Sequence, residues 1–248
     1  MAVPVSGVYA AYTGPVSWDA ALWAAVLRCG PQAALSHFSA AELDGLVDRP
    51  RDAIHVTIPA SKRVWISDRE FDHDRPRIVV HRSDRLPSAR HPARTPPRTR
   101  PEETVLDLVS MSETLDAAFS WLATACGRRL VTPDQLLAAV ASRSRMRWRT
   151  DVLIAVGEIS DGILSHLERR YLRMVERPHG LPRPQRQARM ANGGRSAYLD
   201  NLYGDFGLDV ELDGAAWHPA ESRWQDIRRD NALAGSGIIT LRYSWVDV

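Results

Sequence analysis

Carboxylates interrupt two apolar segments near the C-terminal end of the chain, and no other feature limits the fold as strongly. The segments are residues 198–203 (YLDNLY) and residues 208–214 (LDVELDG). Their apolar residues predict two strands packed on a core, where an ionised carboxylate costs on the order of several kcal/mol unless a partner compensates it. A divalent metal is the partner that best suits several converging carboxylates. The pattern therefore favours a metal-dependent hydrolase.

The predicted strands place the carboxylates where they suit one metal ion. We expect Asp200 and Glu211, on neighbouring strands, to hold Mg²⁺ or Mn²⁺, with the Leu212 carbonyl as a third ligand. Asp213 is two residues beyond Glu211, so it shares that face of the strand and is a further candidate metal ligand.

Ordinary structural roles are the alternatives for these residues. Glu211 could belong to a solvent-exposed strand face; we place Asp209 on the opposite face and therefore prefer a site for Glu211. Asp213 precedes a glycine, which is equally typical of a turn. Glu168 could complete a capping box with Ser165 at the start of a helix.

The C-terminal part of the chain alternates between helical and strand patterns. A helix, three strands, a helix and a strand are predicted, in that order, at residues 165–176, 185–190, 195–203, 208–212, 221–234 and 238–243. We assign this α-β-β-β-α-β order to a domain of residues 161–248.

The first 160 residues predict a mixed α/β region followed by helices. A chain of 248 residues fits one large domain or two ordinary ones. Strands are predicted at residues 54–59 and 78–82, and helices at residues 18–29, 36–46, 105–109, 115–125, 133–141 and 149–159. Residues 86–101 are rich in proline and arginine and predict an extended connector, with a basic strap along nucleic acid as the alternative. We assign residues 1–160 to one region.

The C-terminal pattern resembles the PD-(D/E)xK nuclease superfamily, and more narrowly its Vsr-like family of bacterial domains of unknown function. The resemblance covers about residues 163–248 and is carried by residues 165–172, 180–182, 198–200, 210–214, 218, 229–231 and 241–243. It implies a restriction-endonuclease-like core with a mixed sheet, and a metal-dependent endonuclease that hydrolyses DNA phosphodiester bonds. It also implies a set of catalytic residues: Glu168, Asp200, Glu211, Asp213 and His218.

The chain departs from the superfamily motif at one position. A lysine that steadies the attacking hydroxide usually stands where this chain has Asp213. Two outcomes stay open. Either the site is less active than in the superfamily, or Asp213 adds a metal ligand while Arg229, Arg242 or His218 takes the role of the lysine.

The N-terminal part is similar to actinobacterial proteins related to AbiEi-type antitoxins, on residues 7–9, 34–37 and 54–57. Such proteins normally open with a winged helix-turn-helix, and we expect this chain to start beyond that module. The alternative function is a non-catalytic DNA-binding regulator or antitoxin-like protein with a degenerate nuclease fold, and the absence of that module weakens this alternative. A partner-binding scaffold is a third hypothesis, although a scaffold needs no acidic pocket.

Arginine supplies nearly all the permanent positive charge. The net charge is +2 and Lys62 is the only lysine. Arginine suits phosphate contacts, although genome composition is the simpler explanation of its frequency. A basic rim beside an acidic, metal-binding centre suits a nucleic-acid backbone, DNA more than RNA. The candidate nucleic-acid-binding residues are Arg169, Arg173, Arg186, Arg189, Arg195 and Arg229.

Two further features concern the compartment. The sequence has no apolar run long enough to span a bilayer and no signal-peptide pattern at residues 1–7, so we expect a cytoplasmic protein without a membrane partner. Cys29 and Cys126 are expected to be buried, reduced thiols, and no Cys/His spacing of the zinc-binding kind is present.

Overall fold

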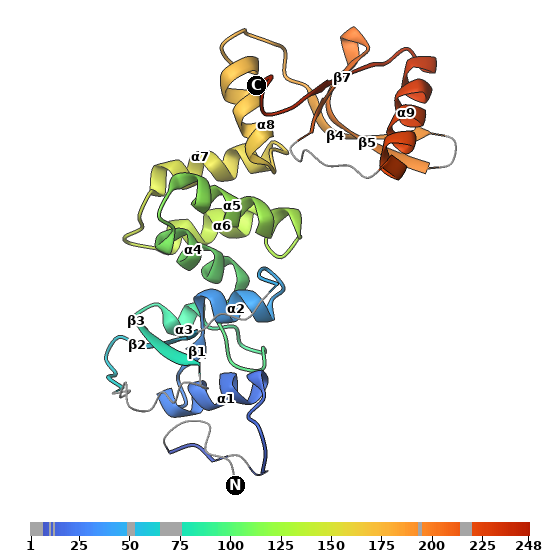
Figure 1. Ribbon diagram of the computed structural model, residues 1–248. Coiled ribbons are helices and arrows are strands. Elements are labelled where there is room, and N and C mark those ends of the chain that lie inside the picture. Colours follow the sequence, from blue (N-terminus) through green and yellow to red (C-terminus); the bar gives the residue numbers. More distant parts are fainter. Residues whose placement is uncertain are drawn as a thin grey trace. The chain divides into compact units, whose positions relative to one another are not determined.

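The structure is a computed structural model that describes residues 7–9, 11, 13–48, 53–64, 76–192, 195–213 and 220–248, with the backbone alone for residues 191–192, 195–197 and 220–226. It is mixed α/β, as the sequence predicts, and contains two mixed sheets, of which the sequence predicted the C-terminal one. The chain divides into two compact units, unit 1 (Met1–Leu153) and unit 2 (Ile154–Val248) (Figure 1). The division lies within helix α7 (Arg149–Ser160), slightly before the predicted boundary. None of the described helices is long and apolar enough to cross a membrane.

Unit 1 is built on a sheet of β1 (Ala34–Leu35), β2 (Ala53–Pro59) and β3 (Arg77–Ser83), in that order. β1 is antiparallel to β2, and β3 is parallel to β2. In this register His81 of β3 lies beside Thr57 of β2.

The central strand β2 is buried on both faces, and its alternation sends different residues to each. Ile54, Val56 and Ile58 pack in one cluster with helix α1 (Trp18–Cys29). His55 and Thr57 point to the other face, toward helix α2 (His37–Leu43), where the His55 and Phe38 rings lie 5.6 Å apart between centroids. The two helices cover opposite faces of the sheet (Figure 1).

The segment rich in proline and arginine is an ordered part of unit 1. It begins with a short helix, α3 (Leu86–Ala89). The Leu35 amide then donates to the Pro97 carbonyl at 2.8 Å, and the Thr99 amide donates to the Leu35 carbonyl at 2.9 Å. Arg98 is buried and forms an ion pair with Asp44, Nε to Oδ1, at 2.8 Å. The predicted connector is thus corrected: the segment packs beside β1 because its backbone and Arg98 find partners there.

Three further helices complete unit 1 before α7: α4 (Pro101–Met111), α5 (Leu115–Gly127) and α6 (Pro133–Ser142). Their periodic apolar residues form the packing face, with Leu106, Phe119, Leu122 and Leu136 almost fully buried.

Unit 2 has the element order that the sequence predicts. Helix α8 (His166–Tyr171) continues into a π-helical turn η2 (Leu172–Glu176) and is followed by three antiparallel strands, β4 (Gln185–Asn192), β5 (Arg195–Tyr203) and β6 (Leu208–Leu212). Helix α9 (Ala220–Gly235) leads to β7 (Ile239–Tyr243), which is parallel to β6. The sheet order is β4-β5-β6-β7.

The two helices of unit 2 cover opposite faces of its sheet (Figure 1). Leu167 and Tyr171 of α8 pack in one cluster with Val210 and Leu212. On the other face, Leu233 of α9 packs with strand residues of β4 and β5, Ala188 and Leu199. This arrangement decides which strand residues can approach α9.

Candidate acidic site of unit 2

The face of β6 that lies opposite the Leu167 cluster carries two carboxylates. Val210 and Leu212 belong to that cluster, so the alternating residues Asp209 and Glu211 point to the other face. Both are buried, with 0% and 5% of their surfaces exposed. The placement of Asp209 on the face opposite Glu211 was wrong, because residues two apart on a strand share a face.

Asp200 is fixed by a hydrogen bond to the neighbouring strand. The ladder between β5 and β6 ends with Asn201 opposite Val210. One residue further, the Asp200 carboxylate replaces the backbone acceptor, and its Oδ2 accepts a hydrogen bond from the Leu212 amide at 3.1 Å. Asp200 and Glu211 therefore lie on adjacent strands at the same end of the sheet.

Asp200, Asp209 and Glu211 influence one another electrostatically. Burial, and next the Asp200 charge, raise the pKa of Glu211 from 4.5 to about 8, against the lowering effect of Arg229. Burial also raises the pKa of Asp209, whose carboxyl interacts with that of Glu211. The pair Asp209–Glu211 is thus arranged to retain one proton between two carboxyl groups.

The oxygens of Asp209 stand out among the buried polar atoms. Its carboxyl interacts with the Glu211 side chain and the Asn201 backbone, but within the described part of the chain neither Oδ1 nor Oδ2 has a donor in full hydrogen-bond geometry. Native proteins leave few buried polar atoms in this state. Sequence reasoning missed Asp209 as a site residue, although the spacing Asp-x-Glu in a strand already places both side chains on one face.

Arginines of α9 and β7 engage the remaining carboxylates. Arg229 forms an ion pair with Glu211. Arg242 pairs with Asp213 at 3.2 Å and with Asp230 at 3.0 Å. Asp213 is therefore held by Arg242, and within the described residues the ligand atoms of Asp200, Glu211 and Asp213 do not form a group within 4.8 Å of one another.

Glu168 caps its own helix and lies near Asp200. Its amide donates to Ser165 Oγ at 3.1 Å, and its Oε2 accepts from the Leu164 amide at 2.8 Å. This is the capping role given as the alternative, with the acceptor reaching one residue further back. Burial raises the pKa of Glu168, and the Asp200 charge adds to that rise. His218, the last predicted catalytic residue, lies outside the described residues.

Several of the candidate DNA-binding arginines have partners inside unit 2. Arg169 and Arg173 bind Glu158, a residue of α7 that is 3% exposed, at 2.8 and 3.0 Å. Arg186 forms an ion pair with Glu176 at 2.6 Å, in which both side chains are buried. The structure also places Arg229 on Glu211, Arg189 at an exposed position, and Arg195 in β5 with its side chain outside the description. Sequence reasoning missed Glu158, since a lone glutamate in a helix carries no signal of its partners.

An apolar pocket of about 400 Å³ lies on the other face of the same sheet. Its lining includes Tyr171, Leu208, Val210 and Tyr243. Because Val210 points away from Asp209 and Glu211, the pocket does not contain the carboxylates.

Comparison with known proteins adds no relative to this picture. No model of a known protein family matches the chain, and no curated protein matches it.

Proposed function

We propose that unit 2 is a metal-dependent endonuclease that hydrolyses DNA phosphodiester bonds. The observation that carries the proposal is the position of Asp200 beside Glu211 on adjacent strands, fixed by the bond from the Leu212 amide to Asp200. A phosphodiester is anionic, so its hydrolysis needs positive charge at the reacting phosphate. The pKa of Glu211 is raised by burial and by the Asp200 charge, and a divalent cation stabilises the charged form of such a carboxylate.

The donor set fits Mg²⁺ or Mn²⁺, which prefer oxygen ligands. Asp200 and Glu211 would hold the ion, and the buried carboxyl of Asp209, which interacts with that of Glu211, gives the site a third carboxylate that the sequence proposal lacked. When bound, such an ion neutralises phosphate charge and lowers the pKa of a water molecule. Glu168, near Asp200, and Asp213, beside Arg242, stay candidate catalytic residues, as does His218.

The proposal includes the resemblance of unit 2 to the PD-(D/E)xK nuclease superfamily. The α-β-β-β-α-β order and the mixed sheet of unit 2 support a restriction-endonuclease-like core of the Vsr-like kind. The AbiEi-like character of the first region and a cytoplasmic location are parts of the same proposal.

DNA contacts are proposed for the exposed arginines of unit 2. Arg189 is exposed, and Arg173 is exposed although it shares Glu158. Arg169 and Arg186 are buried in ion pairs, so we expect them to stabilise the fold of unit 2 rather than to contact phosphate.

A second candidate function is favoured by the ion pair between Arg229 and Glu211. A guanidinium on the carboxylate already neutralises it, and this would leave a DNA-binding, non-catalytic protein related to antitoxins. In the endonuclease, by contrast, Arg229 takes the place of the missing lysine and moves from Glu211 toward the substrate.

The test is cleavage of supercoiled plasmid with Mg²⁺ or Mn²⁺. We expect nicking by the full chain, loss of nicking in Asp200→Asn, and retention in the matched control Asp205→Asn, since Asp205 is exposed and lies outside the site. Plasmid binding without nicking under either metal would favour the second candidate. Neither binding nor nicking, on double-stranded, single-stranded and structured DNA, would reject both.

A further inference from the structure

Three histidines from separate elements of unit 1 meet on the face of the sheet that α2 covers. His37 opens α2, His55 lies in β2 and His81 in β3. One nitrogen of each ring lies within 4.8 Å of the others, and this is the one such group of His, Cys, Asp or Glu in the described part of the chain. The cluster is independent of the carboxylates of unit 2.

The rings are close enough to share one ion. Nδ1 of His55 and Nε2 of His81 are hydrogen-bonded at 2.9 Å. The His37 ring stacks on the His81 ring with 3.8 Å between centroids. His37 and His55 are buried and His81 is partly buried, so the three rings lie under α2 and away from solvent.

A hydroxyl network orients His37. Its Nδ1 lies 2.9 Å from Ser36 Oγ, which also accepts a hydrogen bond from Thr57 Oγ1 at 2.7 Å. With Nδ1 directed at Ser36, Nε2 is the nitrogen of His37 that remains for coordination. Metal-binding histidines normally have their second nitrogen bonded in this way.

The backbone at His37 is held in an uncommon conformation. Its φ is 50°, in the left-handed region that a residue other than glycine seldom adopts. Such strain persists where the surrounding contacts impose it, and it concentrates at functional sites. Here it aims the first side chain of α2 at the histidines of the sheet.

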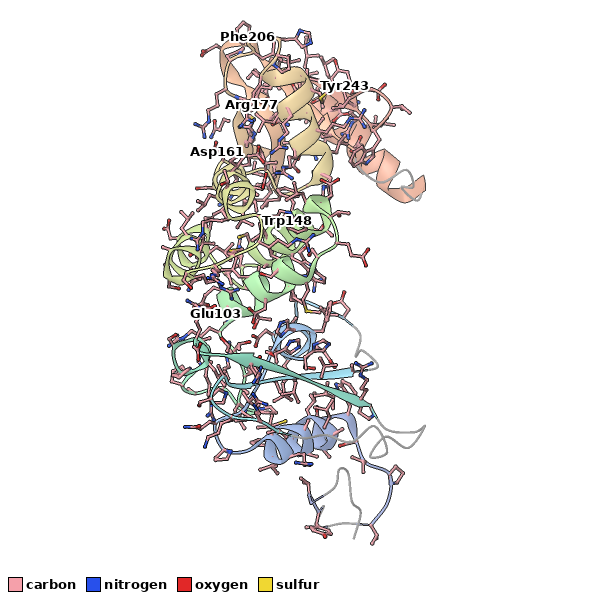
Figure 2. All side chains as sticks on the ribbon, turned by 90° about the vertical axis from the view of Figure 1, so that its left-hand side faces the viewer. Glu103, Trp148, Asp161, Arg177, Phe206 and Tyr243 are labelled. Atoms are coloured by element: carbon pink, nitrogen blue, oxygen red, sulfur yellow. The ribbon has the colours of Figure 1, made fainter. Side chains whose placement is uncertain are left out.

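A polar cavity of about 260 Å³ adjoins the cluster and is lined by His37 and His81. Its far wall contains Glu103 of α4, labelled in Figure 2, with Asp107 and Arg143. Arg143 binds Glu103 at 2.6 Å and Asp107 at 2.8 Å, and Arg85, also in the lining, shares Glu103. The cavity therefore has room for a water molecule or a small polar ligand beside the histidines.

We propose that His37, His55 and His81 bind one Zn²⁺ ion, with the fourth position open to this cavity. Three imidazoles favour zinc or a similar transition metal over Mg²⁺. Three protein ligands and one open position are the arrangement of zinc sites that carry out chemistry.

Metal binding requires a small local change. Zn–N bonds of about 2.0–2.1 Å in tetrahedral geometry separate the nitrogens by about 3.3 Å, so the 2.9 Å contact between His55 and His81 must open by a few tenths of an ångström. The proton of that hydrogen bond moves to the other nitrogen of its own ring, so the ring stays neutral and both facing lone pairs are left for the metal.

The test is metal binding by the full chain, prepared without a histidine tag. Metal-free protein is titrated with Co²⁺ and Zn²⁺. We expect the visible bands of tetrahedral Co²⁺ to appear and to saturate at one equivalent at the three-histidine site, and Zn²⁺ to remove these bands and raise the melting temperature. His37→Gln, His55→Gln and His81→Gln should each lose the Co²⁺ bands. The control His179→Gln, which removes an exposed histidine of unit 2, should keep them.

The wild-type result decides the proposal even where a variant fails to fold. Wild-type protein with native circular dichroism that gives no tetrahedral Co²⁺ bands would show that the histidines form only a hydrogen-bonded core under α2. Asp200→Asn should keep the tetrahedral Co²⁺ bands, so a failed nuclease assay does not bear on this site.

Discussion

Arg229 of α9 and Glu211 of β6 form an ion pair on the face of the sheet that also carries Asp209. Burial and the Asp200 charge raise the pKa of Glu211 by more than the guanidinium lowers it, so that this pKa is about 8. The site therefore contains more negative charge than Arg229 neutralises. This excess of carboxylate over cation is the property that connects stability, pH and metal binding in unit 2.

Glu211→Gln should remove a pH dependence of stability. The pKa of Glu211 is about 8 in the folded protein and 4.5 ordinarily, so between these values the folded state keeps a proton that the unfolded chain has released. Stability then falls as pH rises through this window, by up to about 1.4 kcal/mol per pH unit. Glutamine is neutral at every pH in this window. The stability of the variant relative to the wild type should therefore increase as the pH rises toward 8.

Urea unfolding of both proteins at about pH 5 and about pH 8 measures this difference. Asp205→Asn, at an exposed carboxylate, is the control and should follow the wild type. Equal pH slopes in Glu211→Gln and wild type would refute the raised pKa.

Arg229→Gln should strengthen binding of Mn²⁺ to the acidic site. The guanidinium competes with a metal ion for Glu211, and its removal leaves a carboxylate pair without a cation. We expect the affinity for Mn²⁺ to rise roughly tenfold, which corresponds to about 1.4 kcal/mol of binding free energy. This is smaller than the Coulomb energy of two unit charges about 4 Å apart near a protein surface.

Calorimetric titration with Mn²⁺ measures this affinity, and Arg228→Gln is the matched control because Arg228 is the exposed neighbour on α9. Unchanged or weaker Mn²⁺ binding in Arg229→Gln would mean that the carboxylates are not the metal ligands.

The sequence was a good guide to unit 2 where local patterns decide the outcome. The order of helices and strands follows from periodicity and turn residues, and Asp200 and Glu211 lie on adjacent strands as predicted. The partners of charged residues were not predictable in the same way. Arg169 and Arg186 look like any surface arginine in the sequence, because Glu158 and Glu176 reach them only through the tertiary fold.

The histidine cluster illustrates the same limit. His37, His55 and His81 are far apart in the chain and follow no local spacing rule, so a search for short Cys/His motifs could not find them. Parallel pairing of β2 with β3 brings His55 and His81 together, and the start of α2 adds His37. Only the sheet register reveals such a site.

Glu158→Gln should destabilise unit 2 strongly. Glu158 is 3% exposed and binds Arg169, Arg173 and, at 3.6 Å, Arg177. Loss of its charge breaks the buried ion pair with Arg169, and breaking a buried pair costs about 3 kcal/mol or more. The exposed pair of Asp161 with Arg183 is the control, and Asp161→Asn should cost less than about 1 kcal/mol (Arg177 and Asp161 are labelled in Figure 2). Thermal and urea unfolding compare the two; equal losses would contradict a structural role for Glu158.

Arg189→Ala and Arg186→Ala should separate DNA binding from stability. Arg189 is exposed on β4, so its removal should weaken DNA binding by a salt-dependent amount, with a reduced slope against salt concentration and little change in melting temperature. Arg186 is buried in an ion pair with Glu176, so its removal should mainly lower the melting temperature rather than weaken DNA binding. Fluorescence anisotropy with a labelled duplex at several salt concentrations, beside thermal unfolding, measures both quantities. If Arg189→Ala bound DNA like the wild type at every salt concentration, this edge of the sheet would not be the DNA-binding surface.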